Sequence, residues 1–411
     1  MKRVVVTGLG AVTPVGNDVA STWDALCAGR HGIGPITQFD TTEYKATLAA
    51  EVKGFDPLKY MDRGEARRHD RYVNFALAAA VQAMEDSGLE GKIDPEQFGV
   101  YFSSGIGGFN TMRTEEEKLL SKGPNRVSPY CITMMMPNAA AGEVSIRLKA
   151  KGPSFGIVSA CASSNHAIGE AYRAIAHGYC TAIMAGGAEA TITPVCVAGF
   201  TNCMALSRST DPDRASIPFD KERNGFVLGE GAAALLLEEY EHAKARGAKI
   251  YAELCGYGAT SDAYHITAPD PEGKGGARAM REAYEQAGLD TDRIYINAHG
   301  TSTPMNDKIE TMAIKLALGE EKARRVLVSS TKSMTGHMLG AAGATEAVAS
   351  VLALYHGVVP PTAGLQVSDP ECDLDYVPNE KREAELDLVL SSSLGFGGHN
   401  ACIAFKKVKE D

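Results

Sequence analysis

Short runs of β-branched residues alternate with longer Ala-rich stretches along nearly the whole chain, and this alternation limits the folds it can adopt. We expect strands at Val4–Thr7, Phe98–Ser103, Phe155–Ser159, Ala182–Gly186, Ala233–Glu238, Arg293–Ala298, Val326–Ser329, Leu388–Ser392 and Ala401–Phe405. We expect helices at Asp70–Ser87, Asn138–Leu148, Ser164–Ala176, Gly275–Ala287, Asp307–Leu318 and Ala342–Tyr355. Such alternation favours parallel strands covered by helices. No Pro- or Ser-rich linker divides the chain, so its parts must pack tightly together.

Two segments resemble each other and indicate an internal duplication. Each segment contains Val-Ser, followed shortly by one key residue. A His stands five positions after that key residue, and a Gly stands eight positions after it. These are Cys161, His166 and Gly169 in the first copy, and Lys332, His337 and Gly340 in the second. A further match pairs the run at 100–105 with the run at 294–299. We predict two α/β halves, residues 1–250 and 251–411, with active residues where equivalent strand ends meet.

Charge and cysteine usage exclude several classes of protein. The net charge of −10 argues against nucleic acid as the main partner. No apolar run approaches the roughly 20 residues of a membrane span, and the apolar start after Met1 is too short for a signal peptide. The nine cysteines form no CxxC pair, so we expect free thiols in a cytoplasmic protein, and we expect no zinc site.

Cys161 is the strongest candidate nucleophile. It lies in Gly156-Ile-Val-Ser-Ala-Cys161-Ala-Ser-Ser, at an expected strand-to-helix turn among small residues that let a thioester approach the backbone. The N–H groups and dipole of a helix N-terminus stabilise a thiolate, so we expect a lowered pKa. The same N–H groups can bind a developing oxyanion. A lone cysteine here would more often be structural, and the partners below decide against that interpretation.

Two histidines and a lysine are the expected partners of the cysteine. His299 follows a strand in a loop of Gly, Thr and Ser, which is typical of a functional loop. The internal match places Lys332 and His337 near Cys161, and a lysine in so small and uncharged a neighbourhood needs a carboxylate partner. We expect Glu310 to be that partner. Two neutral histidines that donate to one point can hold the oxygen of a thioester enolate.

A glycine-rich turn near the end of the chain completes the candidate site. In Ser391-Ser-Ser-Leu-Gly395-Phe396-Gly-Gly-His-Asn400, one large aromatic residue stands among glycines. Glycine permits positive φ angles and a close approach of backbone to ligand. Phe396 could therefore act as a gate over the cysteine, and its N–H could be a second oxyanion donor. The alternative to this functional interpretation is that the glycines only turn the chain between two strands.

These segments together resemble the β-ketoacyl-acyl-carrier-protein synthases of the thiolase superfamily, of the elongating Cys-His-His kind and closest to the synthase II branch. The similarity runs from Val4 to Asn400 and rests on Ala160-Cys161-Ala-Ser-Ser, Asn297-Ala-His299-Gly-Thr-Ser-Thr, Thr331-Lys332-Ser-Met-Thr-Gly-His337 and Gly395-Phe396-Gly-Gly-His-Asn. The resemblance implies the thiolase fold, two duplicated halves packed as a five-layered α-β-α-β-α sandwich. It also implies a decarboxylative condensation that lengthens a fatty acyl chain by two carbons.

The resemblance assigns a role to each matching residue. Cys161 would carry the acyl group, His299 and His337 would stabilise the enolate, and Lys332, held by Glu310, would order the site. The N–H groups of Cys161 and Phe396 would form the oxyanion hole. The substrate-binding residues would be Ile106 in the acyl pocket, Thr301 and Thr303 along the pantetheine arm, and Gly397.

The resemblance also implies partners. An acyl carrier protein would bring the phosphopantetheine arm, and no other cofactor is implied, although Asn297, Glu346 and Ser391 make a monovalent cation conceivable. The chain would form a homodimer whose partner copy closes the acyl pocket with residues near Tyr130–Met136. A local basic patch on this acidic chain suits an acidic carrier, with docking mainly through Arg67 and Arg68. A solvated helix start is the alternative for that patch.

Other functions are less consistent with the sequence. Gly8-Leu-Gly10 begins like a dinucleotide fingerprint, but Thr13 stands where the third glycine belongs. A non-catalytic chain-length factor would lack Cys161, and a thiolase would carry a second cysteine in the late glycine turn. A short-chain-preferring or polyketide ketosynthase stays open, because pocket depth separates these enzymes and one sequence does not give it.

Overall fold

The computed structural model describes residues 1–409 and contains one continuous sheet of ten strands. Five strands form the N-terminal half-sheet, in the order β5 (Ser154–Phe155), β4 (Phe98–Ser103), β6 (Ala182–Glu189), β8 (Gly231–Glu239) and β1 (Val4–Val12). Five form the C-terminal half-sheet, in the order β9 (Ala252–Ser261), β15 (His399–Lys406), β14 (Leu388–Gly395), β10 (Ile294–Asn297) and β11 (Leu327–Ser329). The halves join where Val4–Val6 pairs antiparallel with Ala252–Leu254.

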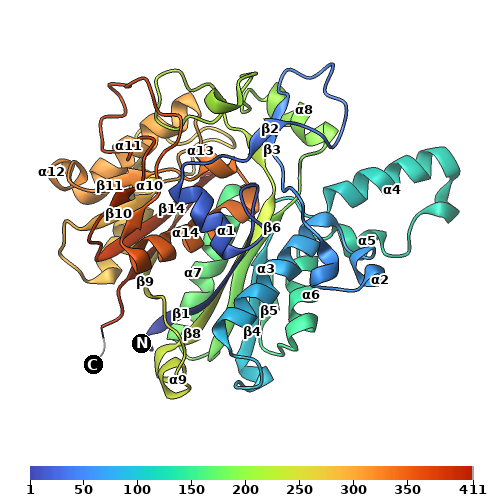
Figure 1. Cartoon of the computed structure of the whole chain (residues 1–411), viewed down its shortest axis with the longest axis horizontal. Helices are drawn as coiled ribbons and strands as arrows, with labels where there is room; N and C mark the ends of the chain where they lie inside the picture. The colour runs from blue at the N-terminus through green and yellow to red at the C-terminus, as the bar shows by residue number, and fades with distance from the viewer. Residues whose placement is uncertain (410–411) are drawn as a thin grey trace.

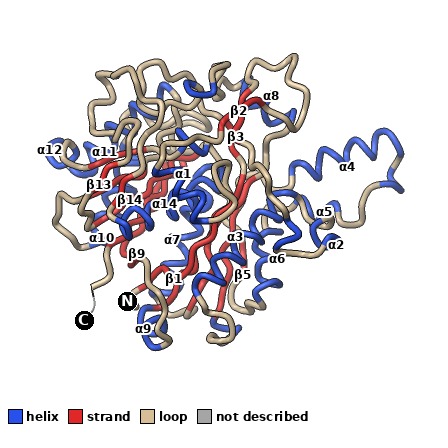
Figure 2. Tube along the Cα trace, viewed as in Figure 1, coloured by secondary structure: helices blue, strands red, loops and turns tan. Residues whose placement is uncertain are grey.

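Helices cover both half-sheets in five layers (Figures 1 and 2). The central layer is α7 (Ser163–Ala176) and α14 (Ala342–His356), and the core around it draws residues from both half-sheets, such as Leu235 and Ile403. The outer face of the N-terminal half-sheet packs on α3 (Arg71–Ser87) and α6 (Ala139–Leu148). The outer face of the C-terminal half-sheet packs on α10 (Lys274–Ala287) and α11 (Pro304–Leu318). The five-layered thiolase fold is therefore confirmed.

The remaining elements lie at the ends and edges of these layers. The further helices are α1 (Val19–Cys27), α2 (Arg63–Ala66), α4 (Phe109–Lys122), α5 (Cys131–Met135), α8 (Pro194–Asn202), α9 (Tyr240–Ala245), α12 (Glu320–Ala323) and α13 (Lys332–Thr335). The further strands are β2 (Ile33–Pro35), β3 (Leu48–Ala50), β7 (Leu228–Gly229), β12 (Val358–Val359) and β13 (Arg382–Glu383). No helix among residues 1–409 is long and apolar enough to cross a membrane.

Two glycine pairs show the duplication in atomic detail. A Cβ on Gly8 or Gly10 of β1 would meet the carbonyl oxygens of Ala83 or Ala79 on α3 at 2.1 or 1.8 Å. In the other half, a Cβ on Gly256 or Gly258 of β9 would meet α10 carbonyls at 2.1 or 2.0 Å. Each pair lets an outer helix lie directly on a strand. The apparent dinucleotide fingerprint at Gly8 is thus a packing feature.

The expected elements are mostly present, but strand β9 and several helices, among them α1, α4 and α8, are not among the predictions. Strand β9 was missed because its glycines weaken the strand pattern, although they are the residues that admit α10. The expected strand at Phe155–Ser159 is only the two-residue β5. The sheet is also mixed: β4, β5 and β6 run parallel, as do β10, β11 and β14, whereas β6, β8, β1, β9, β15 and β14 pair antiparallel in that order. The division at residue 250 lies between α9 and β9 and stays a prediction.

The register of the internal match needs a correction. Its strands are equivalent, because β4 and β5 occupy the places in one half-sheet that β10 and β11 occupy in the other. The central helices, however, each follow a one-turn 3₁₀ helix, Ala160–Ala162 before α7 and Leu339–Ala341 before α14, and each turn begins with a positive φ, 50° at Ala160 and 47° at Leu339. Cys161 is therefore equivalent to Gly340. The second half contains an additional helix, α13, which begins with Lys332, and His337 follows its C-cap Gly336.

Candidate active site

A cavity at the junction of the two halves leads inward to Cys161. It is mostly apolar, and both halves supply its walls. The residues nearest the cysteine are His299, His337, Leu339 and Phe396, and those further out include Phe200, Met204, Thr301, Thr303 and Met305. The cavity therefore gathers the residues that the sequence places in separate segments of the chain. The apolar lining suits a substrate with an apolar chain that reaches a buried nucleophile.

Cys161 lies in the 3₁₀ turn before α7 and is 8% exposed. The neighbouring Ala160 has a φ of 50°, an unfavourable angle for a residue with a Cβ. The Phe396 backbone N–H is hydrogen-bonded to the Cys161 side chain. A Cβ on Gly395 would lie 3.3 Å from the Cys161 backbone nitrogen, so glycine lets this turn come close to the nucleophile. The predicted pairing of the cysteine with the Phe396 turn is present.

The expected lowering of the Cys161 pKa is wrong. Burial raises the pKa of the Cys161 thiol to about 11, although the Lys332 charge and the Phe396 N–H both act to lower it. Desolvation penalises the thiolate more than the nearby positive charge and the N–H favour it. The helix start therefore does not by itself supply a free thiolate at neutral pH. A base at the thiol is needed, and the structure places His337 there.

We expect alkylation of Cys161 by iodoacetamide to accelerate about tenfold per pH unit from pH 7 to pH 10, because only the thiolate reacts. A folded-state pKa raised to about 11 leaves the thiol protonated across this range, so the thiolate fraction keeps growing with pH. The measurement is the rate of adduct formation at Cys161 by peptide mass spectrometry. N-acetylcysteine, with an ordinary thiol pKa, serves as the reference. A rate at Cys161 that levels off below pH 8 would contradict the raised pKa.

His299 and His337 face each other and the cysteine. His337 Nε2 lies 3.0 Å from Cys161 Sγ, and the two imidazole rings have centroids 5.3 Å apart at 86°. One side-chain atom from each of Cys161, His299 and His337 lies within 4.8 Å of the others. Burial, and next the Lys332 charge, hold the pKa of His299 and of His337 well below the usual value, so both rings are neutral at pH 7. Neutral imidazoles can each donate one N–H to a substrate oxygen.

The predicted pairing of Lys332 with Glu310 is wrong. Lys332 begins α13, is 1% exposed, and forms a buried ion pair with Glu346 of α14. Glu310 was expected as the nearest candidate carboxylate, but the partner in the structure is Glu346 on the central helix α14. The pair places a fixed positive charge beside three titratable groups of the site. Lys332 lowers the pKa of Cys161, His299 and His337 alike.

Glu310 supports the site in a different way. Its carboxylate accepts the backbone N–H of His299 at 2.6 Å and that of Gly300 at 2.7 Å, and it accepts the Ser392 hydroxyl at 2.8 Å. The residue is fully buried on α11, and burial raises its pKa while these donors lower it. Glu310 therefore fixes the backbone that carries His299 and links it to β14. Glu310 therefore supports the site, but it holds the His299 loop and not Lys332.

The predicted substrate-binding residues occupy different walls. Thr301 and Thr303 line the cavity, and their hydroxyls are 2.9 Å apart. Gly397 has a φ of 86° in the turn that follows Phe396, as a flexible glycine turn requires. Ile106 lies beyond the cavity lining and packs in the same hydrophobic cluster as Cys161, Leu339 and Phe396. Ile106 is therefore close to the cysteine but separate from the wall that carries the two threonines.

Glu189 is a buried site residue that the sequence reasoning missed. It ends β6, and its carboxylate accepts the N–H groups of Gly105 at 2.9 Å and Gly340 at 3.0 Å, together with the Ser104 hydroxyl at 2.8 Å. Burial raises its pKa to about 7. It ties the loop that carries Ile106 to the turn that carries Leu339. A carboxylate directly after the apolar run at 182–188 was the available signal, because a charge there needs buried donors.

Three buried side-chain oxygens on β10, β14 and α14 are of the kind that a cation would bind. Asn297 of β10 and Ser391 of β14 are register partners on adjacent strands, and Glu346 is the partner of Lys332. Among the described residues, Asn297 Oδ1, Ser391 Oγ and Glu346 Oε2 have no hydrogen-bond partner. Unpaired buried oxygens are costly, and amide, hydroxyl and carboxylate oxygens are the ligands that hard cations prefer. The residues present therefore fit the monovalent cation that the sequence made conceivable.

The basic patch lies on the surface near α2. Arg67 and Arg68 are exposed at the C-terminal end of that helix, together with Lys59 and Arg63. Arg71, in the same stretch of sequence, is instead ion-paired with the buried Glu230 at 2.7 Å. The exposed part of the patch is therefore smaller than the sequence suggests.

Comparison with known proteins agrees with this geometry. Residues 1–243 match the family of the beta-ketoacyl synthase N-terminal domain, and residues 251–366 match that of its C-terminal domain. The chain is 53% identical over 409 residues to a 3-oxoacyl-[acyl-carrier-protein] synthase 2 of Synechocystis sp., covering 99% of this chain and 98% of that protein. It is 49% identical over 408 residues to the enzyme of the same name in Staphylococcus aureus strain COL, with the same coverage.

Solved structures show the same fold over the whole chain. A β-ketoacyl synthase from Burkholderia phymatum matches with a TM-score of 0.90 and 39% identity, covering 100% of both chains. A ketosynthase described as bound to a hexaketide in complex with a type II polyketide acyl-carrier protein matches with a TM-score of 0.90 and 35% identity, covering 99% of this chain and 100% of that chain. On the family matches, the relatives and the Cys-His-His cavity together, this chain belongs to the β-ketoacyl synthase family.

Proposed function

We propose that this protein is a 3-oxoacyl-acyl-carrier-protein synthase II, which condenses malonyl-acyl-carrier protein with an acyl group held on Cys161. The observation that carries the proposal is the juxtaposition of Cys161 Sγ and His337 Nε2 at 3.0 Å with His299 beside them in one buried cavity. A cysteine nucleophile accounts for acyl transfer, and two neutral histidines account for enolate stabilisation.

Acyl loading uses the cysteine and its nearest base. Cys161 Sγ attacks the thioester carbonyl of the acyl carrier while His337 Nε2 takes the thiol proton. The tetrahedral oxyanion is held by the N–H groups of Cys161 and Phe396. The new carbon–sulfur bond forms as the pantetheine sulfur leaves, and that sulfur takes the proton from His337. His337 is then neutral again and the acyl group remains on Cys161.

Condensation follows when a malonyl thioester occupies the cavity. The bond between the malonyl carboxylate and its methylene carbon breaks, carbon dioxide leaves, and the electron pair forms an enolate. His299 and His337 donate N–H groups to the enolate oxygen, which is favoured because both rings are neutral. The enolate carbon attacks the acyl carbonyl, and the Cys161 thiolate leaves. The product is a β-ketoacyl thioester two carbons longer.

His299→Ala and His337→Ala test this division of labour. We expect each change to slow malonyl-carrier decarboxylation by about a hundredfold or more, because one donor to the enolate is lost. The acyl adduct on Cys161 should still form in His299→Ala, since the base and the two backbone donors remain, and should form more slowly in His337→Ala, which lacks the base at the thiol. Release of carbon dioxide and the mass of the acyl-enzyme are the two measurements. Absence of the adduct in His299→Ala, or undiminished decarboxylation in either variant, would contradict these roles.

A short-chain-preferring or polyketide ketosynthase is the alternative, supported by the polyketide relative at 35% identity. Both enzymes would use the same cysteine and histidines, and they differ in the acyl chains that they accept. Ile106, which packs against the hydrophobic cluster that contains Cys161, is the residue that we expect to limit chain length. Mass spectrometry of acyl-Cys161 across a series of acyl carriers of increasing chain length distinguishes these functions, because a synthase II accepts long saturated chains.

The proposal includes an acyl carrier protein as partner, docked on the basic patch. The exposed side chains Arg67 and Arg68 lie on a chain of net charge −10, so the patch is a local site for an acidic surface. We expect Arg67→Glu with Arg68→Glu to raise KM for carrier-bound substrates about tenfold or more, because attraction becomes repulsion. Small thioester substrates do not use the patch, and equal effects on both substrates would remove this assignment.

We further propose a homodimer formed through the edge strand β5. Phe155 on that strand is 43% exposed and Val158 after it is 56% exposed, and at the start of α5 Tyr130 and Ile132 are 48% and 59% exposed. The segment from α4 to α5 also projects from the body (Figure 1). An unpaired strand edge with exposed apolar side chains favours association with a second copy. Sedimentation at twice the chain mass is expected, and a monomer at micromolar concentration would contradict it.

The proposed reaction needs no organic cofactor other than the phosphopantetheine arm that the carrier supplies. A monovalent cation at Asn297, Ser391 and Glu346 would supply positive charge behind the histidine loop and neutralise buried oxygens. Work in the cytoplasm remains a prediction, consistent with nine cysteines that are all free thiols.

A further inference from the structure

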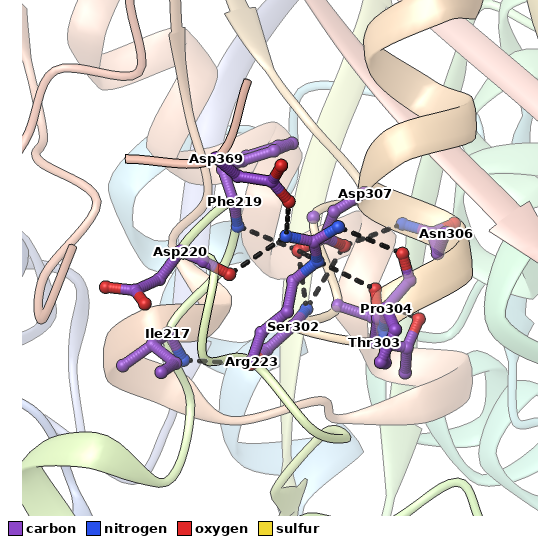
Figure 3. A network of polar contacts seen from close by, with 12 residues as sticks. Ile217, Phe219, Asp220, Arg223, Ser302, Thr303, Pro304, Asn306, Asp307 and Asp369 are labelled. Carbon is purple, nitrogen blue, oxygen red and sulfur yellow. Dashed lines mark hydrogen bonds and ion pairs between the residues drawn. The ribbon is translucent and has the colours of Figure 1, made fainter. Parts of the chain in front are cut away.

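Arg223 is a buried cation behind one wall of the cavity (Figure 3). Its side chain is 4% exposed, and its Nη1 donates to the Asp369 carboxylate at 2.5 Å. A second carboxylate, Asp307, lies 3.7 Å from Nε, and the same Nη1 donates to the Asp220 carbonyl at 2.9 Å. These acceptors offset the free-energy cost of removing the charged guanidinium from water. The arrangement fixes Arg223 in one orientation.

The remaining donors of Arg223 hold the start of α11. Nε donates to the carbonyl of Thr303 at 3.2 Å, and Nη2 donates to the carbonyl of Pro304 at 2.9 Å. Thr303 is the N-cap of α11 and Pro304 is its first residue. Figure 3 shows both carbonyls pointing toward the guanidinium. The planar fork of arginine binds two adjacent carbonyls at once, which the point charge of a lysine does not do in the same geometry.

The loop before α11 is held in an unfavourable conformation by the same region. Ser302 has a φ of 69°, and its backbone N–H donates to Asp307 at 3.2 Å. Its hydroxyl accepts the Ile217 N–H at 2.9 Å, and its carbonyl accepts the Gly225 N–H at 3.0 Å. A non-glycine residue at such a φ persists only where its surroundings impose it. The chain around Arg223 therefore determines where Thr301 and Thr303 stand.

We propose that Arg223 and Asp369 are a positioning pair that sets the pantetheine-binding wall of the cavity. Thr301, Thr303 and Pro304 line the cavity, whereas Arg223 and Asp369 lie behind it and do not line it. The pair acts through the two carbonyls and so orients the two threonine hydroxyls toward the amides of a bound arm. This inference rests on the proposed function, because it assumes that the arm of an acyl carrier occupies this cavity.

The arrangement predicts an effect on binding of the arm rather than on the chemical step. The backbone N–H groups of His299 and Gly300 are held by Glu310, and Ser392 binds the same carboxylate. Those contacts do not pass through Arg223. Loss of the guanidinium fork therefore loosens Thr303 and Pro304 while the histidine donors keep their place. KM for substrates that carry the arm should rise, and kcat should not fall with it.

The test compares two malonyl substrates in the full-length protein. One is malonyl-acyl-carrier protein, and the other is the malonyl thioester of ethanethiol, which lacks the amides of the arm. For Arg223→Lys we expect KM for the carrier substrate to rise about tenfold, with kcat within about threefold of the parent and KM for the ethyl thioester nearly unchanged. Asp369→Asn keeps the side-chain volume and should give a smaller shift in the same direction. It carries the test if Arg223→Lys does not fold.

Arg214→Lys is the matched control. Arg214 belongs to the same segment and binds the Asp220 carboxylate at 3.1 Å and the Gly364 carbonyl, so it is equally structural but lies outside the contacts to Thr303 and Pro304. We expect no selective rise of KM for the carrier substrate in this variant. Equal KM changes on both substrates, a fall in kcat alone, or the same selective effect in Arg214→Lys would overturn the proposal. Failure of the unaltered protein to condense malonyl-carrier would instead contradict the proposed function.

Discussion

Cys161→Ala should abolish condensation, with a loss of about ten-thousandfold or more in rate, because no acyl-enzyme can form without the thiol. The effect is expected to be selective for one half-reaction. His299 and His337 do not depend on the thiol for their positions, since Glu310 holds the His299 backbone and His337 follows α13. Malonyl-carrier should therefore still lose carbon dioxide in the variant, and the released product should be the acetyl carrier.

Two measurements test that expectation: the mass of the protein after incubation with acyl carrier, and the release of carbon dioxide from malonyl carrier. Cys27→Ala is the matched control, because Cys27 ends α1 and does not line the cavity. The control should keep both activities and gain the acyl adduct. Condensation activity that remains in Cys161→Ala, or an acyl adduct at another cysteine, would contradict the mechanism.

Lys332→Met should lower the free energy of unfolding by about 3–5 kcal/mol, because Glu346 would lose the partner that compensates its burial. The pair is almost completely buried, with side-chain exposures of 1% and 3%. The same change should raise the pKa of His299 and of His337, since the Lys332 charge lowers both. A raised histidine pKa moves the acid limb of the activity profile to higher pH, because decarboxylation needs the neutral rings.

A double-mutant cycle decides which carboxylate is the partner of Lys332. We expect a coupling of about 2 kcal/mol or more between Lys332→Met and Glu346→Gln, measured by urea unfolding. Lys332→Met combined with Glu310→Gln should show a coupling below about 1 kcal/mol, because those two side chains share no hydrogen bond and only their charges interact. A larger coupling to Glu310 would restore the pairing that the sequence suggested.

The candidate site was largely predictable because its residues stand in short segments with a strong local pattern. Cys161, His299, His337 and Phe396 each follow or enter a strand end among glycines and small residues. Equivalent strand ends meet at one edge of a duplicated sheet, so local patterns were sufficient to bring these residues together. The partner of Lys332 was not predictable in this way. It depends on which face of α14 packs behind α13, and several carboxylates in the chain fit the sequence equally well.

The internal match shows the same limit from another side. Similar residues around Cys161 and Lys332 indicated a duplication that the structure contains. They nevertheless aligned Cys161 with Lys332, and these two residues are not equivalent. The one-turn helix α13 is an insertion whose sequence has no strong helical pattern, so only the paired 3₁₀ turns before α7 and α14 reveal the register. Strand β9 was missed for a related reason, since its glycines reduce the strand pattern and become intelligible only once α10 lies against them.

The sequence by itself determined the alternation of strands and helices, the nucleophile, both histidines, the lysine and the glycine turn. These features are local, because each follows from residue type and spacing within about ten positions. Only the tertiary structure decided that Glu346 compensates Lys332, that Glu310 holds the His299 loop, that Glu189 ties the Ile106 loop to Leu339, and that Cys161 is too desolvated to ionise unaided. Burial and the pairing of charges depend on which distant segments come into contact, and that contact is a property of the folded chain.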